Sequence, residues 1–343
     1  MEKLRVFSIM VCLSFALLLP GIASGEPIVL TLSDQNSDVS WGPVHATQPW
    51  AKKIEEVTNG RVKIEIYPSQ TLAKGKQNWM ATKAGICDMS WNVMSYYPGM
   101  APYSDVILLP GLPFRTGEKG SELIWKLFEK FPELSGQFAE NKMLILYTSH
   151  PFLLMTSKKQ VKTLEDVRGL KIRTVGGPPI EQMKALGGNP VLLPMPDVYI
   201  AVQKGTIDGL EAAYEPIPGF RLHEVVKYIT EAPLSPSLFG VVMNKSKWNS
   251  LPKDIQDAIM SVSGLEGSKF FGRNFFDAAK EPIKERIGKG EYDIQIYTLP
   301  DEERERWVDV GCRPIWEAWV KNMESKGFTK AREILNAALE LAK

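Results

Sequence analysis

Residues 169–179 read GLKIRTVGGPP and deliver an arginine to the end of a short strand. Leu170, Lys171 and Ile172 alternate between apolar and polar side chains, which is typical of a half-buried strand. A glycine pair and a proline pair then end the strand just beyond Arg173. Open α/β sheets bind ligands at the carboxyl ends of their strands, so Arg173 is a candidate ligand-binding residue.

Strands and helices alternate on both sides of this stretch. The earlier part of the chain predicts strands at 28–33, 61–68 and 86–93, with helices at 50–57 and 74–84. The later part predicts strands at 143–149, 153–157, 169–175, 190–194 and 207–212, with helices at 179–187 and 196–205. The repeated β-α-β order indicates an α/β protein with two lobes.

The rest of the chain predicts more than one passage between the lobes. A strand at 237–245 is followed by one long helix from about 251 to 288, a strand at 292–299 and a helix at 301–325. A helix of that length can span both lobes, as hinge-closing binding proteins require. The expected division is lobe I at 26–150 plus about 238–278, lobe II at 151–237 plus about 279–315, and a C-terminal helical segment at 316–343 that packs across the lobes.

The N-terminus has the pattern of a secretory signal peptide. Lys3 and Arg5 precede an apolar run at 6–23, and small residues follow it. A transmembrane anchor is the alternative, but a Pro-Gly pair breaks the run. We expect cleavage near Gly25 and a soluble chain in the periplasm.

Two cysteines, Cys87 and Cys312, remain after that cleavage. An oxidising compartment permits a disulfide between them. We favour two small buried apolar residues instead, and the sequence does not decide between the two states.

The composition excludes several functional classes. The 343 residues carry a net charge of +1, which gives no strong field for nucleic acid or an anionic membrane. The only histidines, His45, His150 and His223, lie in different segments, and there is no CxxC pair, so neither a metal nor another cofactor is expected. No nucleophile motif or acid-base pair occurs. The sequence therefore predicts a binding protein and not an enzyme.

Several stretches together resemble the periplasmic solute-binding proteins of TRAP (tripartite ATP-independent periplasmic) transporters. They span almost all of the mature chain in the family's order: WAKKIEEVTNGRVKIEIYPSQTL, KAGICDMSWN, TLEDVRGLKIR, LPMPDVYIAVQKGTIDGLE and LFGVVMNKSKWNSLPKDIQDAI. The resemblance implies a two-lobed receptor, expected to be a monomer, that captures a small organic acid, closes on it and delivers it to membrane subunits driven by an ion gradient. It also implies that Arg173 pairs with the ligand's carboxylate.

The chemistry of arginine agrees with that role. A guanidinium group presents a planar fork that matches a carboxylate in bidentate geometry. The alternative is a structural salt bridge between Arg173 and an aspartate or glutamate across the lobes.

Three positions depart from the pattern of family members that bind polar sugar acids. Leu153 stands where those members have a second arginine, and Ala212 stands where they have an asparagine. Val93 stands at the end of a strand that can carry a glutamate in those members. A hydroxyl left unpaired at such positions costs about 1–3 kcal/mol. The departures therefore favour a ligand with an apolar body.

Aromatic and other residues near these positions complete the predicted site. Trp91, Tyr214, Phe152 and Met195 would supply apolar contacts, although Trp91 can instead belong to the core, Tyr214 to a lobe surface and Met195 to packing. Gln35 and Asn36 follow the first strand as contacts or as turn residues. The prediction is an aromatic or hydrophobic monocarboxylate.

Three alternatives stay open. One is a C4-dicarboxylate or sugar acid whose second polar end meets Gln35, Asn92 or Glu215 through water. The other two are a periplasmic enzyme and a sensor subunit built on the same scaffold.

Overall fold

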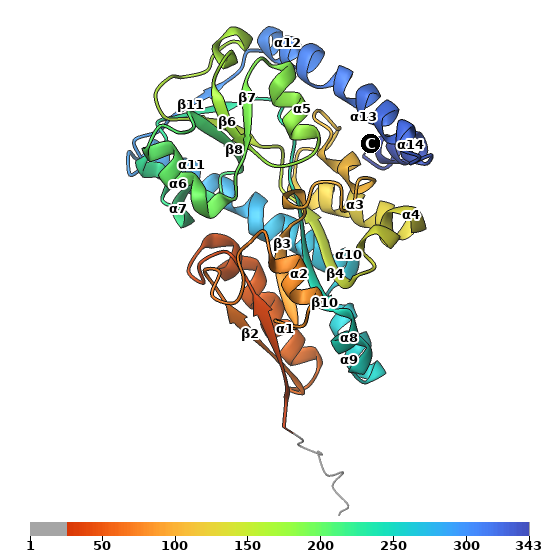
Figure 1. Cartoon of the computed structure of the whole chain (residues 1–343). Helices are drawn as coiled ribbons and strands as arrows, with labels where there is room; N and C mark the ends of the chain where they lie inside the picture. The colour runs from red at the N-terminus through yellow and green to blue at the C-terminus, as the bar shows by residue number, and fades with distance from the viewer. Residues whose placement is uncertain (1–25, 343) are drawn as a thin grey trace, which may run out of the picture.

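The chain folds into two α/β lobes, which Figure 1 shows one above the other. The computed structural model describes residues 26–342, and the predicted signal peptide at 1–25 lies outside them. None of the helices within 26–342 is long and apolar enough to cross a membrane.

Lobe I is built on a five-stranded sheet formed by β1 (Ile28–Ser33), β2 (Val62–Tyr67), β3 (Met89–Val93), β4 (Asn141–Thr148) and β10 (Leu238–Asn244). The order is β2-β1-β3-β10-β4. The first three strands run parallel, and β10 is antiparallel to both β3 and β4. Every residue of β3 is buried, including Ser90 and Asn92 on one of its faces.

Lobe II is built on a six-stranded sheet formed by β5 (Leu153–Thr156), β6 (Lys171–Thr174), β7 (Asn189–Leu192), β8 (Gly209–Ala212), β9 (Tyr228–Glu231) and β11 (Gln295–Thr298). The order is β11-β9-β5-β8-β6-β7, with β6 central to the parallel part. Strand β9 was not predicted from the sequence.

Helices cover both sheets. Lobe I carries α1 (Gln48–Val57), α2 (Asn78–Lys83), α3 (Gly117–Lys130), α4 (Pro132–Ser135), α8 (Lys245–Ser250) and α9 (Lys253–Ser261). Lobe II carries α5 (Pro178–Ala185), α6 (Met195–Gln203) and α7 (Pro216–Gly219). Helix α1 ends as predicted, because Asn59 and Gly60 have φ angles of 53° and 75°, in the left-handed region.

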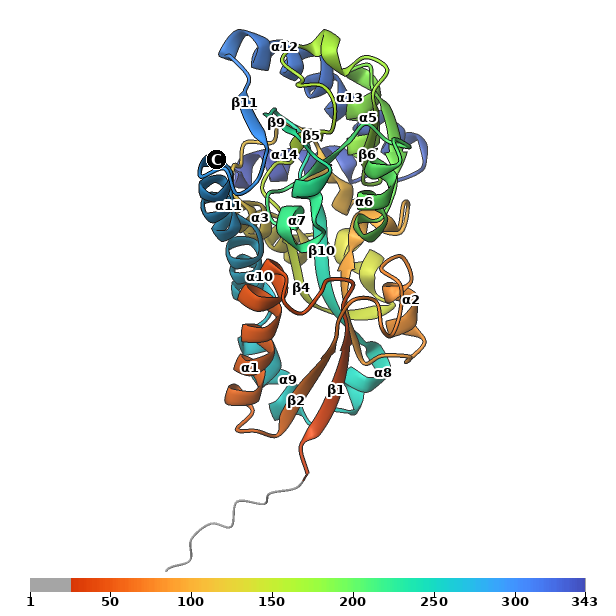
Figure 2. The same cartoon turned by 90° about the vertical axis from the view of Figure 1, so that its left-hand side faces the viewer.

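The chain crosses between the lobes at three places. Residues 149–152 connect β4 to β5, and residues 232–237 connect β9 to β10. The third crossing is helical and consists of α10 (Gly264–Phe271), the π-helical turn η7 (Gly272–Asp277) and α11 (Ala278–Gly288). Figure 2 shows α10 and α11 following one edge of the molecule from lobe I into lobe II.

The predicted single helix from 251 to 288 is wrong in its first part. Helix α9 ends at Ser261, and a break at Val262 and Ser263 separates it from α10. Gly264 then has a φ of +60°, which favours glycine over residues with a side chain. The part that spans both lobes is residues 264–288, and it remains continuous through Pro282.

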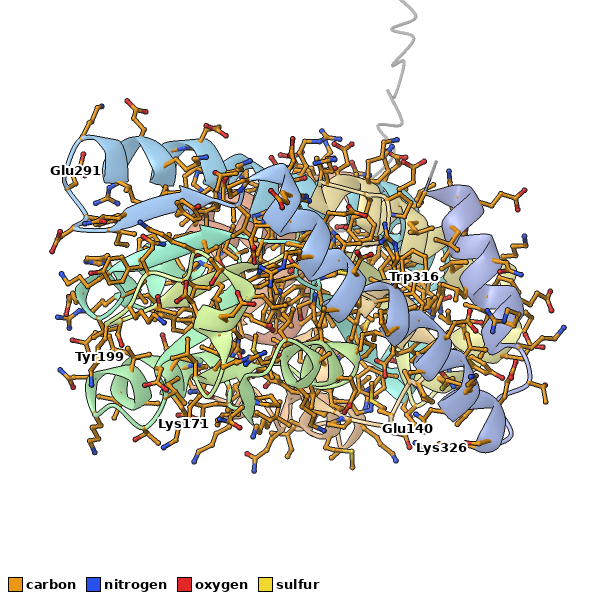
Figure 3. All side chains as sticks on the ribbon, turned by 90° about the horizontal axis from the view of Figure 1, so that it is seen from above. Glu140, Lys171, Tyr199, Glu291, Trp316 and Lys326 are labelled. Carbon is orange, nitrogen blue, oxygen red and sulfur yellow. The ribbon has the colours of Figure 1, made fainter. Side chains whose placement is uncertain are left out.

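The C-terminal helices also connect the lobes. The predicted helix at 301–325 is interrupted at Cys312, which gives α12 (Asp301–Gly311) and α13 (Arg313–Ser325), and α14 (Ala331–Leu341) follows. Helices α12 and α13 contact α5 of lobe II, whereas α14 contacts α3 of lobe I. Trp316 of α13, labelled in Figure 3, donates its Nε1–H to the Pro110 carbonyl of lobe I at 2.8 Å.

The two cysteines have separate surroundings. Cys87 lies beside Thr82 in lobe I, and Cys312 lies beside the Pro233 carbonyl at 3.4 Å. Both thiols are free and buried. Burial raises the pKa of both thiols, that of Cys312 to about 12.

Candidate functional site

A cavity lies where the two lobes meet. Lobe I contributes the turn after β1, strands β3 and β10, and the short helical turn η2 (Met94–Tyr96). Lobe II contributes the carboxyl ends of β6 and β8 and the start of α6. The lining residues are Gln35, Asn36, Trp91, Val93, Tyr96, Phe152, Arg173, Val175, Met195, Ala212, Ala213, Glu215, Pro216, Phe220, Ser237, Phe239, Phe275 and Phe276.

Arg173 lies in this cavity at the end of β6, and only 2% of its surface is exposed. Its Nε–H donates to the Leu193 carbonyl at 2.8 Å, and Nη1 donates to the Glu211 carbonyl at 3.0 Å. Nη2 donates to the Tyr96 hydroxyl at 3.3 Å. A guanidinium has five N–H donors, so one on Nη1 and one on Nη2 have no acceptor among residues 26–342.

No carboxylate of the described chain forms an ion pair with Arg173. The nearest acidic candidate along β8 is Glu211, whose carboxylate instead accepts a hydrogen bond from the Thr174 hydroxyl at 2.7 Å. Burial raises the pKa of the Glu211 carboxyl to about 7, although the Arg173 charge opposes that rise. The alternative role of Arg173 in a structural salt bridge therefore has no partner within residues 26–342.

Tyr96 of lobe I contacts lobe II at Arg173. Its hydroxyl oxygen accepts from Arg173 and also from the backbone N–H of Met195 at 2.8 Å. A neighbouring bond from Gly176 N–H to the Ser95 carbonyl, 3.0 Å long, crosses the same interface. Sequence reasoning missed Tyr96. Its place just beyond the carboxyl end of β3 is the signal that marks it, because ligand sites gather there.

The walls of the cavity are aromatic. Trp91 stacks on Phe275 with 5.6 Å between ring centroids and 13° between planes, and it also contacts Phe239 at 5.4 Å. Phe276 lies 4.8 Å from Phe239. The Trp91 Nε1–H donates to the Tyr147 hydroxyl at 2.7 Å, which fixes the plane of the indole. Trp91 thus lines the cavity and packs in the core at once.

Phe239, Phe275 and Phe276 were not predicted. Phe239 lies in the crossing strand β10, and the Phe275-Phe276 pair lies in the crossing helix at η7. The only sequence signal for Phe275 and Phe276 is that they form an adjacent pair of large aromatic residues within a helical pattern. Periodicity alone does not say which lobe such a pair faces.

A second group of polar side chains lines the same cavity. Buried oxygen atoms of Gln35, Glu215 and Ser237 have no hydrogen-bond partner within the described chain. Burial raises the pKa of the Glu215 carboxyl to about 8, the Gly42 N–H opposes the rise, and the Asp34 charge adds to it. Burial also raises the pKa of Asp34 to about 7.

Of the predicted contacts, the structure brings Arg173, Trp91, Phe152, Met195 and Gln35 together at the cavity. Val93 and Ala212, the two apolar replacements, also line it.

Asn92 is placed elsewhere, because successive residues of a strand face opposite sides. Trp91 and Val93 face the cavity, whereas the Asn92 amide donates to Ser90 and accepts from the Tyr97 hydroxyl at 3.0 Å. We therefore leave Asn92 out of the site.

Tyr214 and Leu153 line a separate groove beside the crossing segments, together with His150. The Tyr214 hydroxyl donates to Glu231 at 2.9 Å, so this ring packs behind the cavity and not within it. Leu153 consequently does not remove a polar contact from the cavity itself. We leave Tyr214 out of the site for the same reason.

Residues 26–342 hold no group of three or more histidine, cysteine, aspartate or glutamate side chains arranged to bind a metal ion. The cavity lining includes a single basic side chain, Arg173.

Comparison with known proteins agrees with this geometry. Residues 42–322 match the DctP family, described as bacterial extracellular solute-binding protein, family 7. The chain is 27% identical over 315 residues to the C4-dicarboxylate-binding periplasmic protein DctP of Rhodobacter capsulatus, covering 87% of this chain and 88% of the relative.

Solved structures of TRAP solute-binding proteins share the fold. One from Rhodoferax ferrireducens, in complex with copurified benzoate, is 26% identical with a TM-score of 0.86, covering 92% of this chain and 97% of that one. One from Bordetella bronchiseptica, with bound (R)- and (S)-mandelate, is 25% identical with a TM-score of 0.84, covering 92% and 99%. The chain therefore belongs to the DctP family of extracellular solute-binding proteins, the solute receptors of TRAP transporters.

Proposed function

We propose that this protein captures an aromatic or otherwise hydrophobic monocarboxylate in the periplasm and delivers it to the membrane subunits of a TRAP transporter. The observation that carries the proposal is Arg173, a buried cation with two free N–H donors and no carboxylate partner in the described chain. An unpaired buried charge is costly, and a bound carboxylate removes that cost. The free donors on Nη1 and Nη2 suit its two oxygens.

The rest of the lining supports an apolar ligand body. Trp91, Phe152, Phe239, Phe275 and Phe276 offer flat apolar surface on several sides of the cavity. Ligand sites that bury small organic molecules are mostly apolar with a few fixed polar groups. The structures of relatives that hold benzoate and mandelate support the same ligand class.

A C4-dicarboxylate is the second candidate, and the Rhodobacter relative's name favours it. A dicarboxylate needs a second cationic or strongly donating partner. The described lining contains no second cation besides Arg173. It contains an acid instead, Glu215, and a second acid, Asp34, lies close enough to affect the Glu215 pKa. The charge pattern therefore favours one carboxylate over two.

An enzyme on this scaffold has less support. Besides Arg173, the titratable side chains of the lining are Tyr96 and Glu215. These two side chains come from different lobes and form no hydrogen bond with each other in the described chain. The lining therefore holds no acid-base pair of the kind that catalysis requires.

Binding would close the lobes. The contacts of Tyr96 with Arg173 and Met195 join the lobes directly over the cavity. A ligand shifts an open-closed equilibrium by its differential affinity for the two states, and the walls from both lobes contact it together only when closed. We propose that the protein acts as a monomer and that its leader is cleaved near Gly25.

A ligand screen tests the proposal. Native mass spectrometry of the purified protein, followed by a thermal-shift screen of organic acids, should identify aryl acids that raise the melting temperature, because a ligand of the native state stabilises it by mass action. Succinate, malate or a uronate binding tightly while no aryl acid binds would contradict the proposal. Recovery of a chemically changed ligand would indicate an enzyme.

A further inference from the structure

The cavity has a second polar region besides Arg173. Glu215 is 4% exposed, Gln35 is 5% exposed, and Ser237 is fully buried. Each has a buried oxygen atom without a hydrogen-bond partner among residues 26–342: Oε1 of Glu215, Oε1 of Gln35 and Oγ of Ser237. Buried polar atoms in proteins are nearly always paired. Gln35 Oε1 lies against Gly75, so the unpaired oxygens of Glu215 and Ser237, two residues that line the cavity, are the ones that indicate a ligand partner.

These side chains come from both lobes. Gln35 follows β1 of lobe I, Glu215 follows β8 of lobe II, and Ser237 lies in the crossing segment just before β10. None of them forms a hydrogen bond with Arg173, whose partners within residues 26–342 are Leu193, Glu211 and Tyr96. The cavity therefore offers a cationic contact and a separate hydrogen-bonding contact to one ligand.

The second region is suited to an uncharged group. Burial and the neighbouring Asp34 charge hold the Glu215 carboxyl neutral near pH 7, because its pKa rises to about 8. A neutral carboxyl donates one O–H and accepts at its other oxygen, and the NH₂ group of the Gln35 amide is a further donor. A second carboxylate there would lie close to the Asp34 and Glu215 acids, whereas a hydroxyl can donate to one group and accept from another.

Building on the proposed function, we propose that Glu215, Gln35 and Ser237 recognise a hydroxyl group carried by the aromatic acid, away from the carboxylate held by Arg173. The ligand class is then a hydroxylated aromatic monocarboxylate. A site that hydrogen-bonds a substrate hydroxyl discriminates against the analogue that lacks it, because its buried polar groups stay unpaired. We expect a hydroxylated ring to bind at least about tenfold tighter than the unsubstituted ring.

Calorimetry with benzoate, 3-hydroxybenzoate and 4-hydroxybenzoate tests this assignment. The wild-type protein should bind one of the hydroxybenzoates at least about tenfold tighter than benzoate. Glu215→Leu should remove that preference, so that benzoate and the hydroxybenzoates bind this variant with similar affinity. Glu55→Leu, at an exposed site on α1, is the matched control and should keep the full preference.

The outcomes separate this inference from the proposed function. If benzoate and both hydroxybenzoates bind equally well, or if Glu215→Leu keeps the preference, the hydroxyl site is wrong and the proposed function stands. If no aryl acid binds, the proposed function fails and this inference fails with it. Gln35→Leu provides a second variant in case Glu215→Leu does not fold, and it should reduce the same preference.

Discussion

Replacing Arg173 should abolish ligand binding without unfolding the protein. In the closed form, its two free N–H donors would form two charge-assisted hydrogen bonds with the ligand carboxylate. Hydrogen bonds to charged groups contribute about 1.5–3 kcal/mol each. Two of them amount to about 3–6 kcal/mol, which converts to an affinity loss of roughly 10² to 10⁴-fold for Arg173→Ala.

Stability should respond differently from affinity. Arg173 is buried without an ion-pair partner in the described chain, so the ligand-free protein loses no salt bridge when it is replaced. Arg173→Met removes an uncompensated buried charge, but it also leaves the Leu193 and Glu211 carbonyls without their donor, which opposes that gain. We expect Arg173→Met to stay folded, with a melting temperature close to that of the ligand-free wild type, and to show no ligand-induced increase.

The assay is titration calorimetry with the best aryl acid, combined with thermal denaturation. Arg332→Met removes a surface arginine that pairs with Glu317 and serves as the control, with unchanged affinity. Arg173→Lys should also bind much more weakly, because an ammonium group lacks the planar fork. An alanine variant that binds within a few-fold of wild type would refute the anchor assignment.

Three further predictions concern the aromatic walls of the cavity, the contacts of Tyr96 between the lobes, and the pH dependence of ligand affinity. Trp91→Ala should weaken an aryl acid by more than about tenfold in calorimetry, since stacking and burial are both lost, while a short aliphatic acid changes little; equal losses for both acids would contradict this. Tyr96→Phe leaves the Met195 N–H and one Arg173 donor unpaired on closure, so ligand affinity should fall about 5- to 150-fold while the fold stays unchanged. An unchanged affinity would show that the Tyr96 hydroxyl does not stabilise the closed form. Burial in the closed form raises the pKa of the Glu215 carboxyl from 4.5 to about 8. The contribution of this carboxyl to ligand affinity is therefore fully present below pH 4.5 and is lost as the pH rises to about 8. Ligand affinity should fall over that pH range by up to about tenfold per pH unit. The accompanying proton uptake should appear in calorimetry as a binding heat that depends on the buffer. Glu215→Gln should reduce this proton uptake, although Asp34, whose pKa is also raised, can still take up a proton.

Much of the fold could be predicted because its local signals are strong. Strict alternation marks β2, and the Asn59-Gly60 pair ends α1 in the left-handed region. The break at Val262 and Ser263 could not be predicted, because the apolar pattern continues from α9 into α10. What interrupts the helix is a backbone turn at Gly264, which sequence periodicity does not reveal.

The site was predicted in part for a similar reason. Arg173 stands out because a strand and its stop signals place it where ligands bind. Strand periodicity alone would have separated Trp91 and Val93 from Asn92. Tyr214 and Phe276 needed the tertiary structure, because only the packing of two lobes decides which side of a turn or crossing helix faces the cavity.

A crystal structure of the protein with its bound aryl acid would show directly whether Arg173 holds the carboxylate. We expect both carboxylate oxygens to accept hydrogen bonds from Nη1 and Nη2 of Arg173, with the ring between the aromatic walls from both lobes. A ligand whose carboxylate lies away from Arg173, or a ligand without a carboxylate, would contradict it.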